Sequence, residues 1–400
     1  MTFSREFGLR PDIIEKDYVL GWLLAGIFNH PALTTQWIFK GGTCLKKCFF
    51  ETYRFSEDLD FTVTDPGHIQ ETFLNGTFTE IAEWIYEQCG IEMPDDTIRF
   101  EVYENTRGGH SVEGRIGYRG PLQQRGSLPR VKLDITDDEA LVLEPIICKV
   151  QHPYTDSPSE GIHARCYAYE EVFAEKIRAL AERERPRDLY DVIHLYRHNE
   201  SSSDRSLVLK TLEEKCRFKG IDIPTVAVLE NKPERVELES EWANMLAHQL
   251  PVLPPFDQFW QELPHVLGWL SGRVVQTATA PYPVQGGEDL GWHPPSWSQS
   301  WGRQVPLEII RFAGANHLCV DLAYKRSQRL IEPYSLRRTQ DGNHLLHALR
   351  HDSGEHRSYR IDQIEGASVT NITFIPKYTI ELTPAAAPLP VPMTHFSRKS

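Results

Sequence analysis

The chain has 400 residues, of which 40% are hydrophobic and 25% are charged, a globular composition that excludes a disordered or a fibrous protein. The length is enough for about two or three hydrophobic cores. The formal net charge of −13 argues against a protein that coats nucleic acid non-specifically, because phosphate binding relies on clustered Lys and Arg, so a nucleic-acid partner would need a local basic surface.

The N-terminal residues lack the pattern of a secretion signal, which is a basic region followed by an apolar run. No stretch of about 20 apolar residues occurs later, so no membrane-spanning helix is predicted. We therefore expect a soluble, cytoplasmic protein.

Hydrophobic periodicity and turn residues divide the first 270 residues into alternating helices and strands. In chain order we expect a helix at 10–30, a Gly-Gly turn and short helix at 41–50, a strand at 58–63, a helix at 68–90, strands between 97 and 136, and helices from 168 to 200 and, less distinctly, to 270.

The seven cysteines are scattered and none forms a Cys-x-x-Cys pair, so the sequence suggests neither a disulfide framework nor a zinc ribbon. Cys44 and Cys48 have the i, i+4 spacing of one helix face and can in principle share a metal ion. We favour the alternative that they are two small core residues.

Asp58 and Asp60 occupy alternate positions of the apolar strand expected at 58–63. The period of two sends both carboxylates to one face, while Leu59 and Phe61 go to the other. Such a pair can bind divalent metal ions, and Mg²⁺ is the natural candidate because it is usually bound by one or two carboxylates together with substrate phosphates. Taken alone, an exposed acidic strand edge explains the pair about equally well.

The residues around this strand favour a phosphate site. Gly41 and Gly42 precede a helical stretch, and a glycine turn that feeds a helix lets backbone N–H groups approach a phosphate. Arg54 and Ser56 add a guanidinium and a hydroxyl close to the aspartates in the chain.

Asp134 lies in a second apolar strand, at 130–136, and alternates with Leu133 and Ile135. If this strand pairs beside 58–63, three carboxylates converge on a site suited to two metal ions.

The helices after these strands carry charged residues that need a partner. Lys176 falls within an apolar stripe, where it must reach solvent or meet an anion; we favour a nucleotide triphosphate over a local carboxylate. Asp188 and Asp191 share one face of the next helix. They either stabilise its first turn with a salt bridge to Arg183 or Arg187, or lie beside the nucleotide.

Residues 271–303 are rich in Pro, Gly, Ser and Trp without periodicity, which predicts a linker. Beyond them, short alternating runs separated by Gly, Asp and Asn predict a small all-β domain, and the first of these runs is 305–312.

Six motifs in chain order resemble those of the AbiEii/MenA-like nucleotidyltransferases, toxins of type IV toxin–antitoxin systems within the polymerase-β-like superfamily. The motifs are Glu15-Lys16-Asp17-Tyr18, Lys40-Gly41-Gly42-Thr43, Arg54-Phe55-Ser56-Glu57-Asp58-Leu59-Asp60-Phe61, Lys132-Leu133-Asp134-Ile135, Ala174-Glu175-Lys176-Ile177-Arg178-Ala179 and Arg187-Asp188-Leu189-Tyr190-Asp191. Each motif alone is modest, but their shared order makes a chance match improbable.

The resemblance implies a mixed α/β (α+β) nucleotidyltransferase core of the polymerase-β-like type with a helical extension. Together with the patterns above, it implies that Asp58, Asp60 and Asp134 bind Mg²⁺, and that Asp58, Asp60, Asp134 and Lys176 are catalytic. The expected nucleotide-binding residues are Gly41, Gly42, Thr43, Arg54, Ser56, Lys176 and Asp188.

Members of this family transfer nucleotides from a nucleoside triphosphate to the 3′ end of tRNA, which blocks aminoacylation, and an antitoxin is usually encoded next door. The resemblance therefore implies an Mg²⁺-dependent toxin of a toxin–antitoxin or phage-defence system, with tRNA or another RNA as acceptor and a cognate antitoxin. Two alternatives stay open: an enzyme that transfers AMP to protein, and a ligand-sensing regulator that acts through the C-terminal domain.

The C-terminal region is similar to WYL domains, which are small SH3-like all-β folds that bind ligands or nucleic acid. The similarity lies in 330–334, 341–347 and 356–364, although His344-Leu345 replaces the Trp-Tyr pair that gives the domain its name. The residues expected to bind a ligand or nucleic acid are Lys325, Arg326, Arg350, Arg357 and Arg360.

The predicted organisation is a nucleotidyltransferase core at 1–200, a helical extension at 201–270, a linker at 271–303, a WYL-like β domain at 304–385 and a flexible tail at 386–400.

Overall fold

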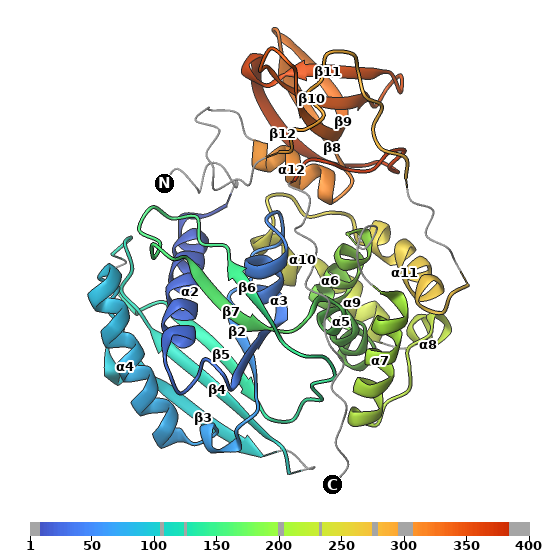
Figure 1. Cartoon of the computed structure of the whole chain (residues 1–400). Helices are drawn as coiled ribbons and strands as arrows, with labels where there is room; N and C mark the ends of the chain where they lie inside the picture. Colours follow the sequence, from blue (N-terminus) through green and yellow to red (C-terminus); the bar gives the residue numbers. More distant parts are fainter. Residues whose placement is uncertain are drawn as a thin grey trace.

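The structure is a computed structural model that describes residues 9–104, 108–123, 126–198, 204–231, 234–273, 279–294 and 307–383. It has three parts: a large sheet flanked by helices, a group of helices beside this sheet, and a smaller C-terminal sheet (Figure 1). The tail predicted at 386–400 lies outside the described residues.

Within the described residues, the large sheet has seven strands in the order β3-β4-β5-β2-β1-β7-β6. They are β1 (Trp37–Lys40), β2 (Asp58–Val63), β3 (Arg99–Glu104), β4 (His110–Gly117), β5 (Arg130–Thr136), β6 (Ile146–Val150) and β7 (Ile162–Cys166). β2 pairs in parallel with β5, and β1 with β7, whereas the other neighbours are antiparallel. The predicted mixed α/β fold is therefore confirmed.

One face of the sheet is covered by α2 (Pro11–Asn29) and α4 (Glu71–Cys89), close to the bounds predicted for both helices. Phe39, Leu59 and Phe61 point to this side and are fully buried in a core shared with the two helices. The apolar residues of β1 and β2 thus pack against the two helices. The residues that alternate with them point to the opposite face of the sheet.

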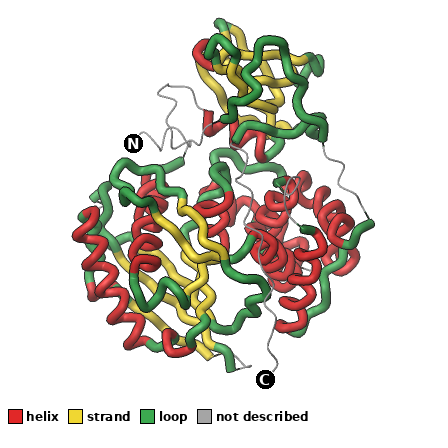
Figure 2. Tube along the Cα trace, in the orientation of Figure 1, coloured by secondary structure: helices red, strands yellow, loops and turns green. Residues whose placement is uncertain are grey.

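The elements on the other side are mostly helical (Figure 2). They are α3 (Gly41–Cys44), which continues into a π-helical turn η1 (Leu45–Phe49), then α5 (Tyr169–Arg183), α6 (Pro186–Arg197), α7 (Arg205–Lys219), α8 (Val226–Glu230), α9 (Glu234–Ser240), α10 (Trp242–Leu246) and α11 (Phe256–Leu270). Three short 3-10 turns are η2 (Pro66–His68), η3 (Asp95–Thr97) and η5 (Ala247–Gln249). In the described ranges, no helix combines the length and apolar composition needed to cross a membrane.

The C-terminal part is a five-stranded antiparallel sheet in the order β11-β10-β9-β8-β12, preceded by a helix. Its elements are α12 (Leu307–Ala315), β8 (Leu318–Tyr324), β9 (Ser327–Arg338), β10 (His344–Arg350), β11 (His356–Arg360), η6 (Ile361–Gln363) and β12 (Ile364–Thr373). The strand prediction for 305–312 is wrong, because α12 covers most of it. Leu307 and Ile310 are three residues apart and also fit one face of a helix, so a run this short is compatible with a strand or a helix.

The C-terminal sheet is packed against the helical part. Tyr190 of α6, Phe259 of α11, Ile310 of α12 and Leu318 of β8 are buried in one continuous hydrophobic cluster. The Tyr190 hydroxyl also donates a hydrogen bond of 2.9 Å to the side chain of Asn316. The two parts therefore share a core.

Residues 279–294, which were predicted to belong to the linker, lie against the C-terminal sheet. Tyr282 is buried in a cluster with Tyr334, and Glu288 forms a bridge to Thr339. A stretch rich in Pro and Gly gives no periodic signal, so this packing could not be anticipated from the pattern.

A buried ion pair joins α7 to α5. Lys215 Nζ is 3.0 Å from Glu171 Oε1, and both side chains are 0% exposed. Burial lowers the pKa of Lys215, but the charges of Glu171 and Glu175 outweigh it, so the pKa is raised overall. Glu171 also accepts hydrogen bonds from the backbone N–H groups of Val142 and Leu143. The pair is therefore charged and fully enclosed.

We expect K215M to lower the free energy of unfolding by about 3–5 kcal/mol, because Glu171 then loses its buried counter-charge. Lys210 lies on the exposed side of the same helix and supplies the control. K210M should change the free energy of unfolding by less than about 0.5 kcal/mol. Urea unfolding followed by circular dichroism measures both, and equal stability of the two variants would contradict this account.

Candidate active site

The acidic residues of β2 lie on the face of the sheet that points toward α5. Asp58 and Asp60 are partly exposed, while Leu59 between them is buried on the opposite face. Thr62, next on the acidic face, shares a hydrogen bond of 2.6 Å with the hydroxyl of Tyr167, just ahead of α5. The predicted alternation of β2 is thus confirmed.

The register of the sheet places charged residues in one row. Asp134 of β5 is directly opposite Asp60, and Glu113 of β4 is opposite Asp134. On the other side of β2, Lys40 of β1 is opposite Asp60. With Asp58 two residues earlier in β2, the structure brings the three predicted aspartates together on one face of adjacent strands.

The two glycines that begin α3, directly after β1, form a turn that lies against this row. Gly41 has a φ of 79°, and a Cβ built on it would lie 2.0 Å from Oδ2 of Asp60. A Cβ on Gly42 would lie 2.5 Å from Nη2 of Arg54 and 3.0 Å from Oγ of Ser56. Side chains at these two positions would displace the groups that the turn contacts, so glycine is required at both.

Thr43 connects the turn to the acidic strand. Its hydroxyl donates a hydrogen bond of 2.5 Å to the backbone carbonyl oxygen of Asp58, and the residue is 1% exposed. This bond holds the start of α3 against the start of β2, so Thr43 aligns the turn with the first aspartate.

Burial and neighbouring charge raise the pKa values of two aspartates in this row. The pKa of Asp60 is raised to about 6, first by burial and then by the charge of Asp134, although Lys176 acts in the opposite direction. Burial also raises the pKa of Asp58. The surroundings therefore do not fully neutralise the carboxylates, and a divalent cation would relieve this excess negative charge. Carboxylate oxygens are also the donors that a hard cation such as Mg²⁺ prefers, so this donor set fits it.

Two cations beside the carboxylates were not assigned to the site from sequence. Nη1 of Arg187 lies 4.0 Å from Oδ2 of Asp58, and Nζ of Lys132 lies 3.0 Å from Oδ1 of Asp134. The alternation of β5 puts Lys132 on the same face as Asp134 and could have indicated it. Arg187 belongs to one of the six motifs, but no local pattern places it beside Asp58, because it comes from a separate helix.

Lys176 of α5 is paired with carboxylates of α6. Its Nζ is 2.8 Å from Oδ2 of Asp191 and 3.5 Å from Oδ1 of Asp188. Burial lowers the pKa of Lys176, but these two charges raise it more. The local ion pair is thus the partner that the structure shows, and contact with a triphosphate stays a prediction.

Asp188 is also held by Arg183, through hydrogen bonds of 2.8 and 3.0 Å from Nε and Nη2. The salt bridge to Arg183 that the sequence suggested is therefore present. A role for Asp188 beside a nucleotide stays a prediction.

Arg54 is buried, and its guanidinium nitrogens donate hydrogen bonds to protein side chains. Its Nε and Nη2 donate hydrogen bonds of 2.7 and 2.8 Å to Asp191, and Nη1 donates one of 2.9 Å to Gln249. The Tyr53 hydroxyl donates to the same carboxylate. Burial raises the pKa of Asp191, but Arg54 and Lys176 lower it more. Arg54 thus fixes the loop before β2 relative to α6, and its contact with a nucleotide stays a prediction.

The five basic residues predicted to bind a ligand in the C-terminal domain lie at its surface and do not share one face. Lys325 and Arg326 form the turn between β8 and β9, with φ values of 50° and 60°. Arg357 and Arg360 are three residues apart in β11, so they project from opposite faces. The three arginines pair with acids nearby in the chain, which are Asp352 for Arg350, Glu355 for Arg357 and Asp362 for Arg360. Ligand binding by this set stays a prediction.

A glycine turn against carboxylates on adjacent strands of a mixed sheet agrees with the nucleotidyltransferase site that the sequence resemblance implies. Residues 22–262 match the family model described as nucleotidyl transferase AbiEii toxin, type IV TA system. The match covers more than half of the chain, so the chain belongs to this family of nucleotidyltransferase toxins. The family implies a nucleoside triphosphate as substrate, a divalent metal ion and a cognate antitoxin. The C-terminal sheet lies beyond the match, and its similarity to WYL domains stays a prediction.

Solved structures that resemble the chain include MenT4, a nucleotidyltransferase toxin from Mycobacterium tuberculosis, and JHP933 from Helicobacter pylori. MenT4 is 18% identical over 66% of this chain and 86% of its own, with a TM-score of 0.42. JHP933 is 17% identical over 66% of this chain and 94% of its own, with a TM-score of 0.40. Comparison with curated proteins gave no match. Because these likenesses are distant, the assignment depends on the family match.

G41A should abolish most nucleotide transfer, because the added Cβ would displace the Asp60 carboxylate, and a misplacement of about 1 Å can cost on the order of 10²-fold in rate. Gly90 supplies a matched control. Its φ is 75°, but a Cβ there would meet nothing within 4 Å. Both variants should lose about 1 kcal/mol of stability from backbone strain, and only G41A should lose activity. Equal activity of G41A and G90A would argue against the contact with Asp60.

The raised pKa of Asp60 also predicts how the free energy of unfolding depends on pH. An unfolded aspartate ionises near pH 3.9, whereas the pKa of Asp60 in the folded protein is about 6. Its contribution to stability is therefore present below about pH 4 and is lost as pH rises through 6. In metal-free buffer, the free energy of unfolding of D60N relative to wild type should therefore rise by on the order of 2 kcal/mol from pH 4 to pH 7. Urea unfolding at both pH values measures this gain. Parallel pH profiles of D60N and wild type would contradict it, and the exposed control D96N should show no gain.

Proposed function

We propose that the protein transfers a nucleotide from a nucleoside triphosphate to the 3′ end of a tRNA, in a reaction that depends on Mg²⁺. The observation that carries the proposal is the group of three carboxylates, Asp58, Asp60 and Asp134, on adjacent parallel strands, with a glycine turn directly against it. Membership of the AbiEii family supports the nucleotide substrate. The six-motif resemblance to family members that modify tRNA supports the acceptor.

Asp58, Asp60 and Asp134 would hold the Mg²⁺. When bound, Mg²⁺ lowers the pKa of the attacking hydroxyl and neutralises charge on the phosphates. The raised pKa of Asp60 supports this choice, because binding of a dication offsets the repulsion between neighbouring carboxylates.

The groups of the chain bind and orient the reactants. The 3′ hydroxyl oxygen of the RNA forms a bond to the α-phosphorus, the bond from that phosphorus to the bridging oxygen breaks, and pyrophosphate leaves. Gly41 and Gly42 let the phosphates approach the backbone closely, and the hydroxyl of Ser56 lies against the same turn. Arg187, beside Asp58, adds positive charge at this edge of the site.

Lys176 would neutralise the leaving pyrophosphate. To do so, Lys176 must first break its contact with one of its two carboxylate partners. The longer of its two contacts, 3.5 Å, is to Asp188. Arg183 holds Asp188 independently, so Lys176 can release Asp188 without leaving it unpaired. Asp188 would then form part of the nucleotide pocket, while Asp191 keeps Lys176 in place.

The test uses the purified protein with Mg²⁺, mixed tRNA and each α-labelled nucleoside triphosphate in turn. Label from at least one nucleotide should enter RNA. D134N should lower this rate on the order of 10²-fold or more, because it removes a charge that stabilises the transition state through the metal. D96N, an exposed aspartate near β3, should keep the wild-type rate.

The position of the label also separates the alternatives. Label in protein would overturn the tRNA acceptor and support transfer of AMP to a protein hydroxyl. No label in either product, from a chain that folds normally, would contradict the proposed catalysis and leave the ligand-sensing regulator as the remaining hypothesis.

A further inference from the structure

Four of the seven cysteines lie together beside the glycine turn, on three separate segments. Cys44 is the last residue of α3, Cys48 is one helical turn later in η1, Cys166 ends β7, and Cys148 is in the neighbouring β6. The sulfur atoms of Cys44, Cys48 and Cys166 all lie within 4.8 Å of one another. Cys148 is not one of this group of three, but in the β6–β7 pair Ile146 is opposite Cys166, so Cys148, two residues further along β6, faces the same side of the sheet as Cys166.

This spacing fits tetrahedral coordination by sulfur. Zinc binds thiolates at about 2.3 Å, which separates the sulfur atoms of a tetrahedron by about 3.8 Å. The observed limit of 4.8 Å among three of the cysteines therefore requires shifts of only about an ångström. These three sulfurs come from α3, η1 and β7, and a shift of Cys148 toward them would complete the closed set of four ligands that structural zinc sites use.

The charge around the cluster also suits a bound cation held by thiolates. Lys47 precedes Cys48 in the chain, and a positive charge beside a cysteine favours its thiolate form. The thiolate is the form that binds metal. Lys47 is buried and forms an ion pair of 2.7 Å with Asp17, so its positive charge is held in place beside the cluster.

We propose that Cys44, Cys48, Cys148 and Cys166 bind one zinc ion in a structural site. Each thiol that is protonated releases its proton to solvent when zinc binds, and no oxidant or reductant takes part. The site is separate from the acidic row of β2 and β5, and it does not depend on the proposed transfer reaction.

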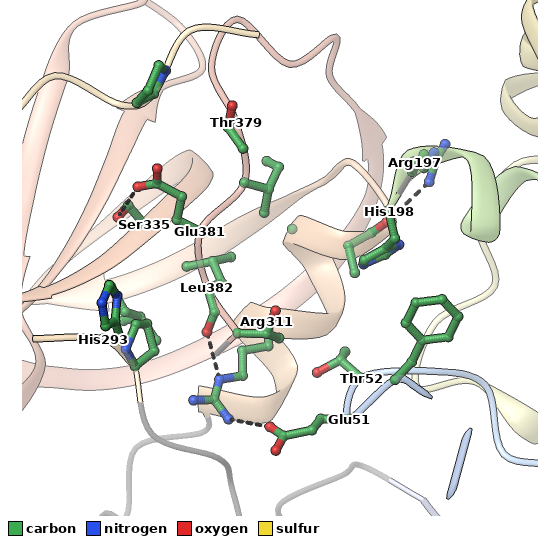
Figure 3. Close-up of a pocket in the computed structure, with 18 of the residues that line it drawn as sticks. Glu51, Thr52, Arg197, His198, His293, Arg311, Ser335, Thr379, Glu381 and Leu382 are labelled. Atoms are coloured by element: carbon green, nitrogen blue, oxygen red, sulfur yellow. Dashed lines mark hydrogen bonds and ion pairs between the residues drawn. The ribbon is translucent and has the colours of Figure 1, made fainter. Parts of the chain in front are cut away.

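A cavity gives the metal a path to the cluster. The cavity has a volume of about 1060 Å³, and both Cys48 and Cys148 lie on its wall. Figure 3 shows part of it, where Glu51, two residues beyond η1, faces Arg311 of α12. The other two cysteines are 0% exposed, so zinc would enter from the cavity and be enclosed on the far side.

Zinc at this place would fasten the glycine turn to the sheet. Cys44 follows Gly42 by two residues in the same short helix, whereas Cys148 and Cys166 belong to strands β6 and β7, which carry none of the three aspartates. The ion would thus fix the start of α3 from the side opposite Asp60, and its loss should loosen the turn that contacts this carboxylate.

Metal content tests the proposal without any assay of activity. Protein purified in reducing buffer without added zinc should contain about one zinc per chain by mass spectrometry. Cobalt substitution should give the strong visible absorption of tetrahedral cobalt thiolate. C48S and C148S should lower the zinc content at least about tenfold. Cys89, which is also partly exposed but outside the cluster, supplies the control, and C89S should keep its zinc.

A second measurement uses the wild-type protein alone and so avoids variants that fail to fold. A chelator should lower its melting temperature by several degrees, and added zinc should restore it. Zinc below about a tenth of an equivalent per chain, iron in its place, or a disulfide within the cluster under reducing conditions would each overturn the proposal.

Discussion

Two carboxylates that face each other on adjacent parallel strands repel one another, and the arrangement of the rest of the site follows from this repulsion. Asp60 and Asp134 cannot separate, because the register of β2 and β5 fixes them side by side. Burial is the largest cause of the raised pKa of Asp60, about 6, and the charge of Asp134 adds to it. Lys132 and Lys176 reduce the repulsion without removing it. A bound cation would offset the cost of this arrangement, which is the reason that we propose a metal site here.

The neighbouring elements hold this row by buried polar contacts. Asp191 accepts two hydrogen bonds from Arg54 and pairs with Lys176, so one carboxylate of α6 positions both the loop before β2 and the lysine of α5. On the other side of the row, Gly41 brings the turn into contact with Asp60. The proposed zinc site lies behind that turn. The ion pairs of Asp191 would therefore hold the three aspartates from the side of α5 and α6. The zinc site would hold the glycine turn from the side of β6 and β7.

Local patterns predicted the features that depend on few residues, and tertiary packing decided the others. The alternation of β2 sent Asp58 and Asp60 to one face, because a strand has a period of two wherever it lies. Its pairing with the strand of Asp134 remained conditional, since no pattern within a strand specifies its neighbour. A local carboxylate was one of the two partners considered for Lys176, but for the same reason no pattern specified that Asp188 and Asp191 supply it. Cys148 is about a hundred residues from the first cysteines of the cluster, so only the fold brings them together.

The most direct test of the account is a crystal structure of the protein with Mn²⁺ and a non-hydrolysable nucleoside triphosphate, because anomalous scattering locates manganese without assumptions about its ligands. We predict manganese bound by Asp58, Asp60 and Asp134, with the triphosphate extending from the glycine turn toward Lys176. Nucleotide and manganese bound at another surface, with these three carboxylates free of metal, would contradict the account.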